Sequence, residues 1–330
     1  MSREIGAGKL FCWLSGVLTI AMCLGIIIYV AARGAPAISW DFISQPPKMV
    51  LLKGLSGGIL TPLAGTIVLT AMSIILVLPL ALTMAVYYAE YAGDNLGAKL
   101  LRLGNDVLAG VPTIVIALFG LIIFSYPELS FLSIKVAGTA SERAFGRSFL
   151  AAAITMAVMV LPYITKSVEE AIAAVPYTFR EAAYGLGVSK WRTIRKVVLP
   201  AACRGIASGA VLGVGRVASD VAIVWFCLGA TLTYSGPEKW WQPQNWLDTL
   251  RSAGSTLSSY IYYASPVGNG HNAEKAYGAA LVLIVIILLF NAAVYYINGL
   301  AAFRPKVSFP RRKVAAAAAF LSSIPQNIKK

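Results

Sequence analysis

The sequence KSVEEAIAAVPYTFREAAYGLGVSKWRTIRKVVLP, residues 166–200, separates two long apolar runs of this chain. Charged residues recur through it, and proline and glycine divide it into short pieces. Because these two residue types interrupt helices, we expect short helices with a glycine turn between them. The predicted pieces are 168–174, which stops near Pro176, a helix that begins at Thr178 or Phe179 and is broken by Gly185 and Gly187, and the basic stretch 190–198.

The apolar runs on either side belong to a set of six. Hydrophobic residues make up 58% of the 330 residues and charged residues 13%, which is about half the usual share. This composition excludes a disordered chain and argues against a soluble enzyme, which would lack polar surface. Since a helix needs about 20 residues to cross a membrane, we predict an all-α polytopic membrane protein. Its six transmembrane helices are expected at 10–32, 65–88, 107–127, 148–165, 205–229 and 276–303.

The first run, 10–32, could also be read as a secretory signal with a small-residue cleavage site at 35–37. Signal cores are about 7–15 residues long, and this run is longer. We therefore expect a retained anchor helix, which forms an N-terminal part over residues 1–56 together with an outer loop.

The net charge of +14 comes from residues that lie between the apolar runs, so we interpret it as a topology signal and not as nucleic-acid binding. With a cytoplasmic N-terminus, the inner segments carry 18 Lys and Arg in 93 residues and the outer segments carry 9 in 97. Both termini are therefore predicted in the cytoplasm. The basic residues 304–330 are predicted to form a cytoplasmic tail held to anionic lipid.

Metal and disulfide chemistry find little support in the sequence. The four cysteines form no CxxC pair and lie among apolar residues, and His271 is the single histidine. We interpret the cysteines as packing residues and expect no metal site.

Several residues of the segment 166–200 stand at a fixed spacing, namely Glu181, Ala182, Ala183, Gly187, Val197, Leu199 and Pro200. This spacing resembles the EAA loop of ABC-importer permeases, EAA-x3-G-x9-I-x-LP, with Val197 in place of Ile. In that family the loop, here 181–200, forms a coupling helix that sits in a cleft of a cytoplasmic ATPase. The resemblance implies an ABC type I importer permease fold. The plainer alternative is an ordinary amphipathic connector.

Further stretches resemble the phosphate-specific permeases of the PstA and PstC type. They are GGILTPLAGTIVLT (57–70), AVYYAEYAGD (85–94), DVLAGVPTIVIALFG (106–120), LSSYIYY (257–263) and EKAYGAALVL (274–283), the last two closer to the PstA type. The resemblance covers residues 57–303, which we expect to form the permease domain.

The chain has no G-x-x-x-x-G-K-[ST] motif, so it cannot hold ATP in a Walker loop and is not expected to be an enzyme. The resemblance implies that ATP and magnesium are bound by a separate PstB-like ATPase dimer, and that this chain binds no cofactor. It also implies a second, PstC-like permease subunit and an extracytoplasmic PstS-like phosphate-binding protein. The implied location is the bacterial or archaeal plasma membrane (inner membrane).

The fifth run contains two charged residues, Arg216 and Asp220. An arginine inside the membrane is costly, so a role or a partner is expected. Four residues apart on one helix, the two could pair. Gly205, Gly209 and Gly213 fall on the same face and predict close helix packing. The charges are therefore expected to point into protein or a pathway.

Phosphate permeases carry a glutamate four residues after an arginine, so the resemblance implies that Arg216, Ser219 and Asp220 lie on the phosphate path. This chain departs from the pattern, with Asp220 in place of Glu and Ser219 in place of Gly. A guanidinium can hold two oxygens of a tetrahedral anion. We expect Asp220 to accept a hydrogen bond from a protonated phosphate oxygen, which sulfate lacks. The alternatives are an ion pair that fixes helix register and a snorkelling arginine.

Four functions stay open on the sequence alone. The first is an ATP-driven permease subunit for inorganic phosphate. The second is an ABC permease for another oxyanion or small solute, and the third is a membrane signalling subunit that transports nothing. A channel or secondary carrier is the fourth, and the EAA loop argues against it.

Overall fold

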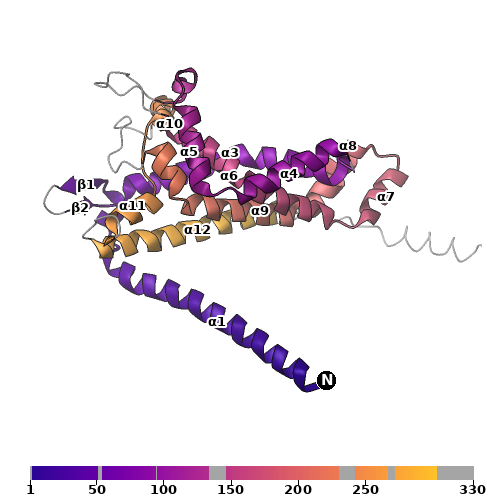
Figure 1. The fold of residues 1–330 in the computed structure, drawn as a ribbon, viewed down its shortest axis with the longest axis horizontal. Helices are drawn as coiled ribbons and strands as arrows, with labels where there is room; N and C mark the ends of the chain where they lie inside the picture. The colour runs from indigo at the N-terminus through magenta and orange to yellow at the C-terminus, as the bar shows by residue number, and fades with distance from the viewer. Residues whose placement is uncertain are drawn as a thin grey trace, which may run out of the picture.

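The computed structural model describes residues 2–50, 54–93, 95–133, 146–229, 242–266 and 272–302 (Figure 1). The predicted tail 304–330 and His271 lie outside the described residues. The long helices are α1 (Ser2–Gly34), α3 (Leu60–Val86), α4 (Leu96–Gly110), α5 (Thr113–Phe124), α6 (Phe149–Ala173), α9 (Leu199–Ser219) and α12 (Ala273–Ala302). The short helices are α2 (Trp40–Ser44), α7 (Tyr177–Gly185), α8 (Lys190–Thr193), α10 (Trp246–Arg251) and α11 (Leu257–Ala264).

Three π turns and one hairpin complete the elements that matter here. The π turns are η2 (Tyr87–Tyr91), η4 (Ile194–Val198) and η5 (Val224–Leu228). Strands β1 (Pro47–Val50) and β2 (Gly54–Gly57) pair antiparallel, with Pro47 opposite Gly57. The all-α membrane fold is confirmed, and this hairpin is an addition that the sequence pattern did not predict.

Among the residues that the structure describes, five helices are long and apolar enough to cross a membrane, and they correspond to five of the six predicted spans. The third predicted span, 107–127, is not one straight helix. The pair α4 and α5 replaces it, and the two helices are bent by 104°. Pro112 causes the break, because it forces the preceding Val111 out of the helical region, to φ −71° and ψ 129°.

The loop between α6 and α9, which the sequence predicts in the cytoplasm, is also shorter than predicted. The residues 168–174 continue α6 and do not form a separate helix. The basic stretch 190–198 runs through α8 and η4 directly into α9, so that one membrane-length helix spans Lys190–Ser219. The fifth span therefore begins earlier than residue 205 and ends at Ser219, well before the predicted end at Gly229.

The core of the bundle is built around α6. Its apolar side chains at Met156, Val160, Ile164 and Val168 have 0% exposure. Helices α3 and α9 pack against α6, and α12 packs against α9. Burial of these aliphatic side chains is the main stabilising contribution within the bundle.

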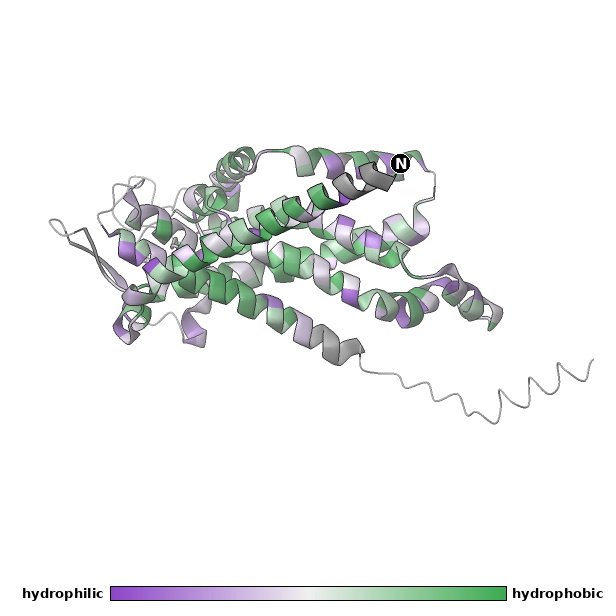
Figure 2. Ribbon diagram, turned by 90° about the horizontal axis from the view of Figure 1, so that it is seen from below, coloured by the Kyte–Doolittle hydropathy of each residue, from purple (hydrophilic) through white to green (hydrophobic). Residues whose placement is uncertain are grey.

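Helix α1 departs from the bundle (Figure 1). None of the side chains in its membrane-length window is buried, and hydrophobic residues line its length (Figure 2). It meets α12 near its end, where a Cβ on Gly34 would lie 2.5 Å from the carbonyl oxygen of Tyr277. The ring of Tyr29 stands edge-on to that of Tyr277, with centroids 5.8 Å apart. The crossing is therefore close, and the rest of α1 faces outward.

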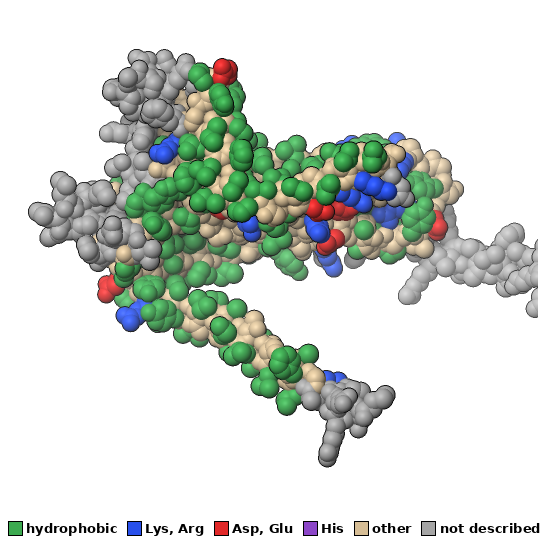
Figure 3. Space-filling model, viewed as in Figure 1, with side chains coloured by type: hydrophobic (Ala, Val, Ile, Leu, Met, Phe, Trp, Pro, Cys, Tyr) green, Lys and Arg blue, Asp and Glu red, His purple; other side chains and the backbone are tan. Residues whose placement is uncertain are grey.

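The two ends of the bundle carry different elements. The hairpin, α10 and α11 lie at one end, and α7 and α8 lie at the other (Figure 1). Lys, Arg, Asp and Glu side chains gather toward the α7 and α8 end, while apolar side chains cover much of the remaining surface (Figure 3). The predicted topology places the α7 and α8 end in the cytoplasm.

Candidate coupling element and anion path

Helix α7 carries the first part of the predicted coupling loop. Pro176 precedes the helix with an extended backbone. Gly187 follows it with a φ of +74°, a conformation that glycine adopts readily and other residues do not. A Cβ at Gly187 would have nothing within 4 Å, so the constraint on this residue is conformational and not steric.

The outward side of α7 combines polar and apolar residues. Glu181 and Ala182 are exposed, and Ala183 is buried. Large apolar side chains are exposed on and beside the helix, with Leu186 at 83%. The others are Tyr177, Phe179, Tyr184 and Trp191. Large apolar side chains that are exposed together in this way are typical of surfaces that bind other proteins.

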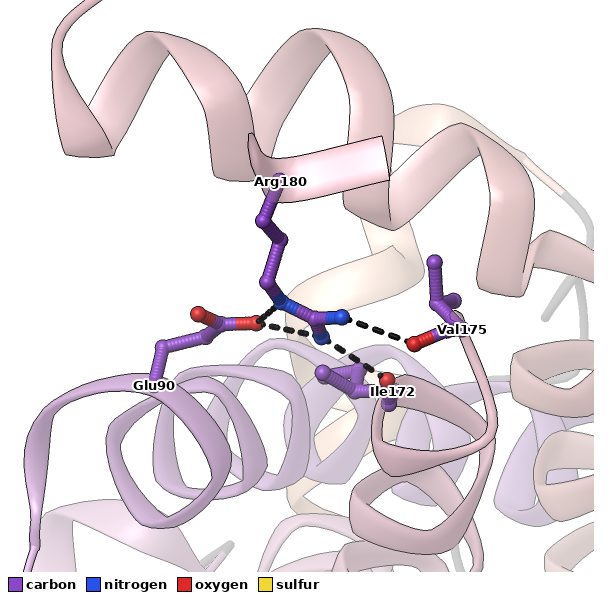
Figure 4. Close-up of polar contacts among 4 residues, drawn as sticks. All are labelled: Glu90, Ile172, Val175 and Arg180. Carbon is purple, nitrogen blue, oxygen red and sulfur yellow. Dashed lines mark hydrogen bonds and ion pairs between the residues drawn. The ribbon is translucent and has the colours of Figure 1, made fainter. Parts of the chain in front are cut away.

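The inward side of α7 is held by Arg180, which is 7% exposed (Figure 4). Its Nε and Nη2 atoms both donate to Oε1 of Glu90, at 2.9 and 2.7 Å. Its Nη1 donates to the carbonyl oxygen of Val175 at 2.8 Å, and Nη2 also donates to that of Ile172 at 3.1 Å. Glu90 lies in η2, so one side chain joins α7 to the ends of both α3 and α6.

An open hollow of about 470 Å³ lies beside this ion pair. Ala89, Pro176, Tyr177, Tyr184 and Lys190 contribute to its lining, together with the pair itself. The hollow is open to solvent, and Arg180 bridges α7 to the bundle beside it.

The second part of the motif, Leu199 and Pro200, begins α9. Pro200 is exposed and does not end the helix. It has no N–H to give to the preceding turn, and the wider π turn η4 immediately before it accommodates the missing bond. The structure thus separates Glu181, on the exposed helix α7, from Leu199 and Pro200, on the membrane-length helix α9.

The three glycines of α9 lie against α6. A Cβ at Gly205 would collide with the Ala171 Cβ, and one at Gly213 would come within 2.5 Å of the Ile164 Cδ1. At Gly209 it would lie 3.0 Å from the Ser167 hydroxyl oxygen. Small residues here allow the two backbones to approach closely.

Arg216 lies one turn beyond these glycines and is exposed in the single chain. Its guanidinium carbon sits 4.3 Å from the centre of the Tyr163 ring, and its Nε donates to the Met159 sulfur at 3.3 Å. The Tyr163 hydroxyl donates to the carbonyl oxygen of Ala109 at 3.1 Å, next to the break between α4 and α5. Stacking on an aromatic ring holds a guanidinium in place while its outer N–H groups stay free for an anion.

The possible pairing of Arg216 with Asp220 along one helix face is not seen in the structure. Helix α9 ends at Ser219, and Asp220 has an extended backbone with ψ 134°. Its Oδ1 accepts a hydrogen bond from the Ile223 N–H at 2.8 Å, and its carbonyl oxygen accepts one from the Ser258 hydroxyl at 3.0 Å. A carboxylate that caps the next helical turn has a hydrogen-bond donor in the backbone and does not need the arginine as a partner.

Ser219 is exposed at the last turn of α9, and its hydroxyl donates to the carbonyl oxygen of Gly215 at 2.8 Å. The structure therefore brings Arg216, Ser219 and Asp220 to one helix end without joining them by an ion pair.

Three contributors were missed by the sequence reasoning. Tyr163 had no signal beyond its place in a predicted span. Glu90 and Arg180 stood in quoted motifs, yet their contact joins residues 90 positions apart and no spacing rule predicts it. Among the residues that the structure describes, no group of three or more His, Cys, Asp or Glu could hold a metal ion.

Comparison with known proteins shows the family to which this chain belongs. Residues 78–307 match the family described as binding-protein-dependent transport system inner membrane component. The chain belongs to that family. It is 32% identical to the phosphate transport system permease protein PstA 1 of Mycobacterium tuberculosis (strain ATCC 25618 / H37Rv), over 90% of this chain and 88% of that protein. It is 29% identical to the probable ABC transporter permease protein YqgI of Bacillus subtilis (strain 168), over 86% of this chain and 92% of that protein.

Comparison with solved structures supports the fold of the chain. The crystal structure of a bacterial alginate ABC transporter, in complex with an alginate pentasaccharide-bound periplasmic protein, matches with a TM-score of 0.57 at 15% identity. The match covers 89% of this chain and 95% of that chain. The predicted ABC importer permease fold is thereby confirmed.

Proposed function

We propose that this chain is the transmembrane permease subunit of an ATP-driven ABC importer for inorganic phosphate. The observation that carries the proposal is α7, which presents Glu181 and Ala182 outward in a chain 32% identical to a phosphate permease. A helix that is exposed and still firmly attached to the bundle suits a part on which a motor pushes.

The proposed partners follow from the missing Walker loop and from the resemblance to phosphate permeases. A cytoplasmic ATPase dimer of the PstB type would supply ATP hydrolysis and bind ATP with magnesium, because this sequence has no Walker loop. A PstC-like permease would form the other half of the pathway, and a PstS-like protein outside the membrane would deliver phosphate. The chain itself would catalyse no reaction. We place it in the inner membrane of a bacterium or archaeon as a multi-pass protein.

The anion path is proposed to pass the end of α9. Arg216 would hold two phosphate oxygens, since the residue is exposed and its guanidinium is held against the Tyr163 ring. Asp220 lies close to Arg216 in the sequence and carries a negative charge, of the same sign as phosphate. Its repulsion of the anion would weaken binding at Arg216 enough for release. In alternating access, closure of the ATPase pair would push α7 and open this region toward the cytoplasm.

A reconstituted complex tests the proposal. Liposomes containing this chain, a PstC-like permease and the ATPase, with the phosphate-binding protein outside and ATP inside, should take up radiolabelled phosphate. Arg216→Ala should lower the uptake by about 10-fold or more, because each hydrogen bond to a charged group contributes roughly 1.5–3 kcal/mol. ATPase binding to the complex should stay unchanged. Uptake that persists in the variant would remove Arg216 from the path.

Ser219 and Asp220, the two departures from the phosphate-permease pattern, favour a second candidate, transport of another oxyanion. Competition by unlabelled sulfate, molybdate or arsenate in the same liposomes would separate the cargoes. A complex that binds the ATPase and moves no anion would instead support the signalling subunit.

A further inference from the structure

The buried ion pair between Arg180 and Glu90 has a consequence beyond holding α7 in place. Its two side chains are 9% and 6% exposed. Removing one charge from a buried pair leaves the other without compensation, and this is strongly unfavourable. The two elements that carry these residues, α7 and η2, are therefore expected to move together.

The geometry of the guanidinium also fixes the orientation of α7 relative to η2. Arg180 binds Glu90 through two nitrogens and the carbonyl oxygens of Ile172 and Val175 through the same planar group. A planar fork with several bonds fixes orientation, which a single ammonium does not. A tilt of α7 is thus transferred to η2 and to the end of α6.

A second contact leads to the same π turn. The Lys190 Nζ lies 4.5 Å from the centre of the Tyr91 ring, and Lys190 begins α8. Both helices of the coupling loop therefore rest on η2, a single turn of five residues. The Lys190 contact is the weaker of the two, because Lys190 is exposed.

The surroundings leave room for movement. The hollow of about 470 Å³ beside the pair gives α7 space to tilt. The receiving turn η2 continues α3, which packs along α6, and α6 carries the Tyr163 and Met159 side chains that hold Arg216. A continuous set of contacts thus runs from the exposed loop to the anion path.

We propose that Arg180 and Glu90 are positioning residues that transmit movement of α7 to α3 and α6, so that ATP hydrolysis is converted into opening of the path. This rests on the proposed function, because it requires an ATPase that acts on α7.

The test uses Glu90→Gln in the complete reconstituted complex, since glutamine keeps the shape of the side chain and removes its charge. ATP hydrolysis should continue, and phosphate taken up per ATP hydrolysed should fall by about fivefold or more, within the usual range of coupling between sites. The double variant Glu90→Gln with Arg180→Gln should be no worse than the poorer single variant, because both remove the same contact.

A matched control is available at the same end of the bundle. Arg102 and Glu169 form an ion pair at 2.8 Å that joins α4 to α6 and involves neither helix of the coupling loop. Arg102 also donates to the carbonyl oxygen of Tyr88 in η2 at 2.9 Å, so the control is made at Glu169, which does not take part in that bond. Glu169→Gln should leave uptake per ATP at the wild-type value. Arg180→Lys keeps the charge and loses the fork, and should give an intermediate value.

The outcomes separate the two proposals. A wild-type complex without ATP-driven uptake would overturn the proposed function. A wild-type complex that transports, together with a Glu90→Gln complex of unchanged uptake per ATP, would overturn the linkage alone. If Glu90→Gln fails to bind the ATPase in co-purification, Arg180→Lys takes its place, and a wild-type ratio in that variant would also overturn the linkage.

Discussion

At the scale of single residues, the end of α9 shows how one carboxylate can serve two purposes. Asp220 caps the turn before η5 through the Ile223 N–H, so its place in the fold does not depend on Arg216. Its charge is therefore available to act on an anion. A substitution that keeps the hydrogen bond to the Ile223 N–H and removes the negative charge can therefore separate the structural role of Asp220 from its role toward the anion.

Asp220→Asn is that substitution, because an asparagine oxygen also caps a helix. We expect normal membrane insertion, slower phosphate uptake and a preference for phosphate over sulfate reduced by about 10-fold or more, since a hydrogen bond to a charged group is worth roughly 1.5–3 kcal/mol. Uptake of both labelled anions into liposomes measures this. An unchanged preference would show that Asp220 does not read the P–OH group.

At the scale of elements, the coupling loop depends on two different uses of glycine. Gly187 allows a left-handed backbone, while Gly205, Gly209 and Gly213 allow two helices to touch. The chain offers a neighbouring glycine without either constraint as a control for each use.

Gly187→Val should uncouple ATP hydrolysis from uptake, because a β-branched residue is strained at a φ of +74° and the end of α7 must shift. Insertion into the membrane should be intact. Gly185→Val is the control, since a Cβ there meets nothing within 4 Å. Equal uptake per ATP in both variants would count against the role of the turn.

Gly213→Val should separate α9 from α6, because its Cβ would come within 2.5 Å of Ile164. Overpacking of this kind costs about 1–3 kcal/mol, and the midpoint of thermal unfolding in detergent should fall. Gly215→Val should leave the midpoint unchanged, as a Cβ at this position has open space. A similar loss of stability in both variants would contradict the packing argument.

At the scale of the whole molecule, the positions of the membrane-length helices were largely predictable, because long apolar runs report on the membrane itself. The exceptions have physical causes. Pro112 bends the third span, and the sequence alone does not say how the chain continues after a proline. The end of α9 at Ser219 removes the possible pairing of Arg216 with Asp220 along one helix face, because a spacing rule assumes that the helix continues. The Arg180 and Glu90 contact needed the tertiary structure.

Labelling can check the orientation of the whole chain. In a background without the native cysteines, Leu186→Cys should react with an impermeant maleimide only from the cytoplasmic side, and Leu247→Cys only from outside. Both positions are well exposed, at 83% and 56%, so access is not limited by packing. Reaction of Leu186→Cys from outside would invert the topology and separate α7 from any cytoplasmic ATPase.

The close crossing at Gly34 determines where the far end of α1 lies. A helix of 33 residues is about 50 Å long, so a change of about five degrees at the crossing displaces the other end by about 4 Å. Adding one methyl group at Gly34 would act as a wedge against Tyr277. The absence of a side chain at this one position therefore allows the close crossing of α1 with α12, on which the direction of the whole of α1 depends.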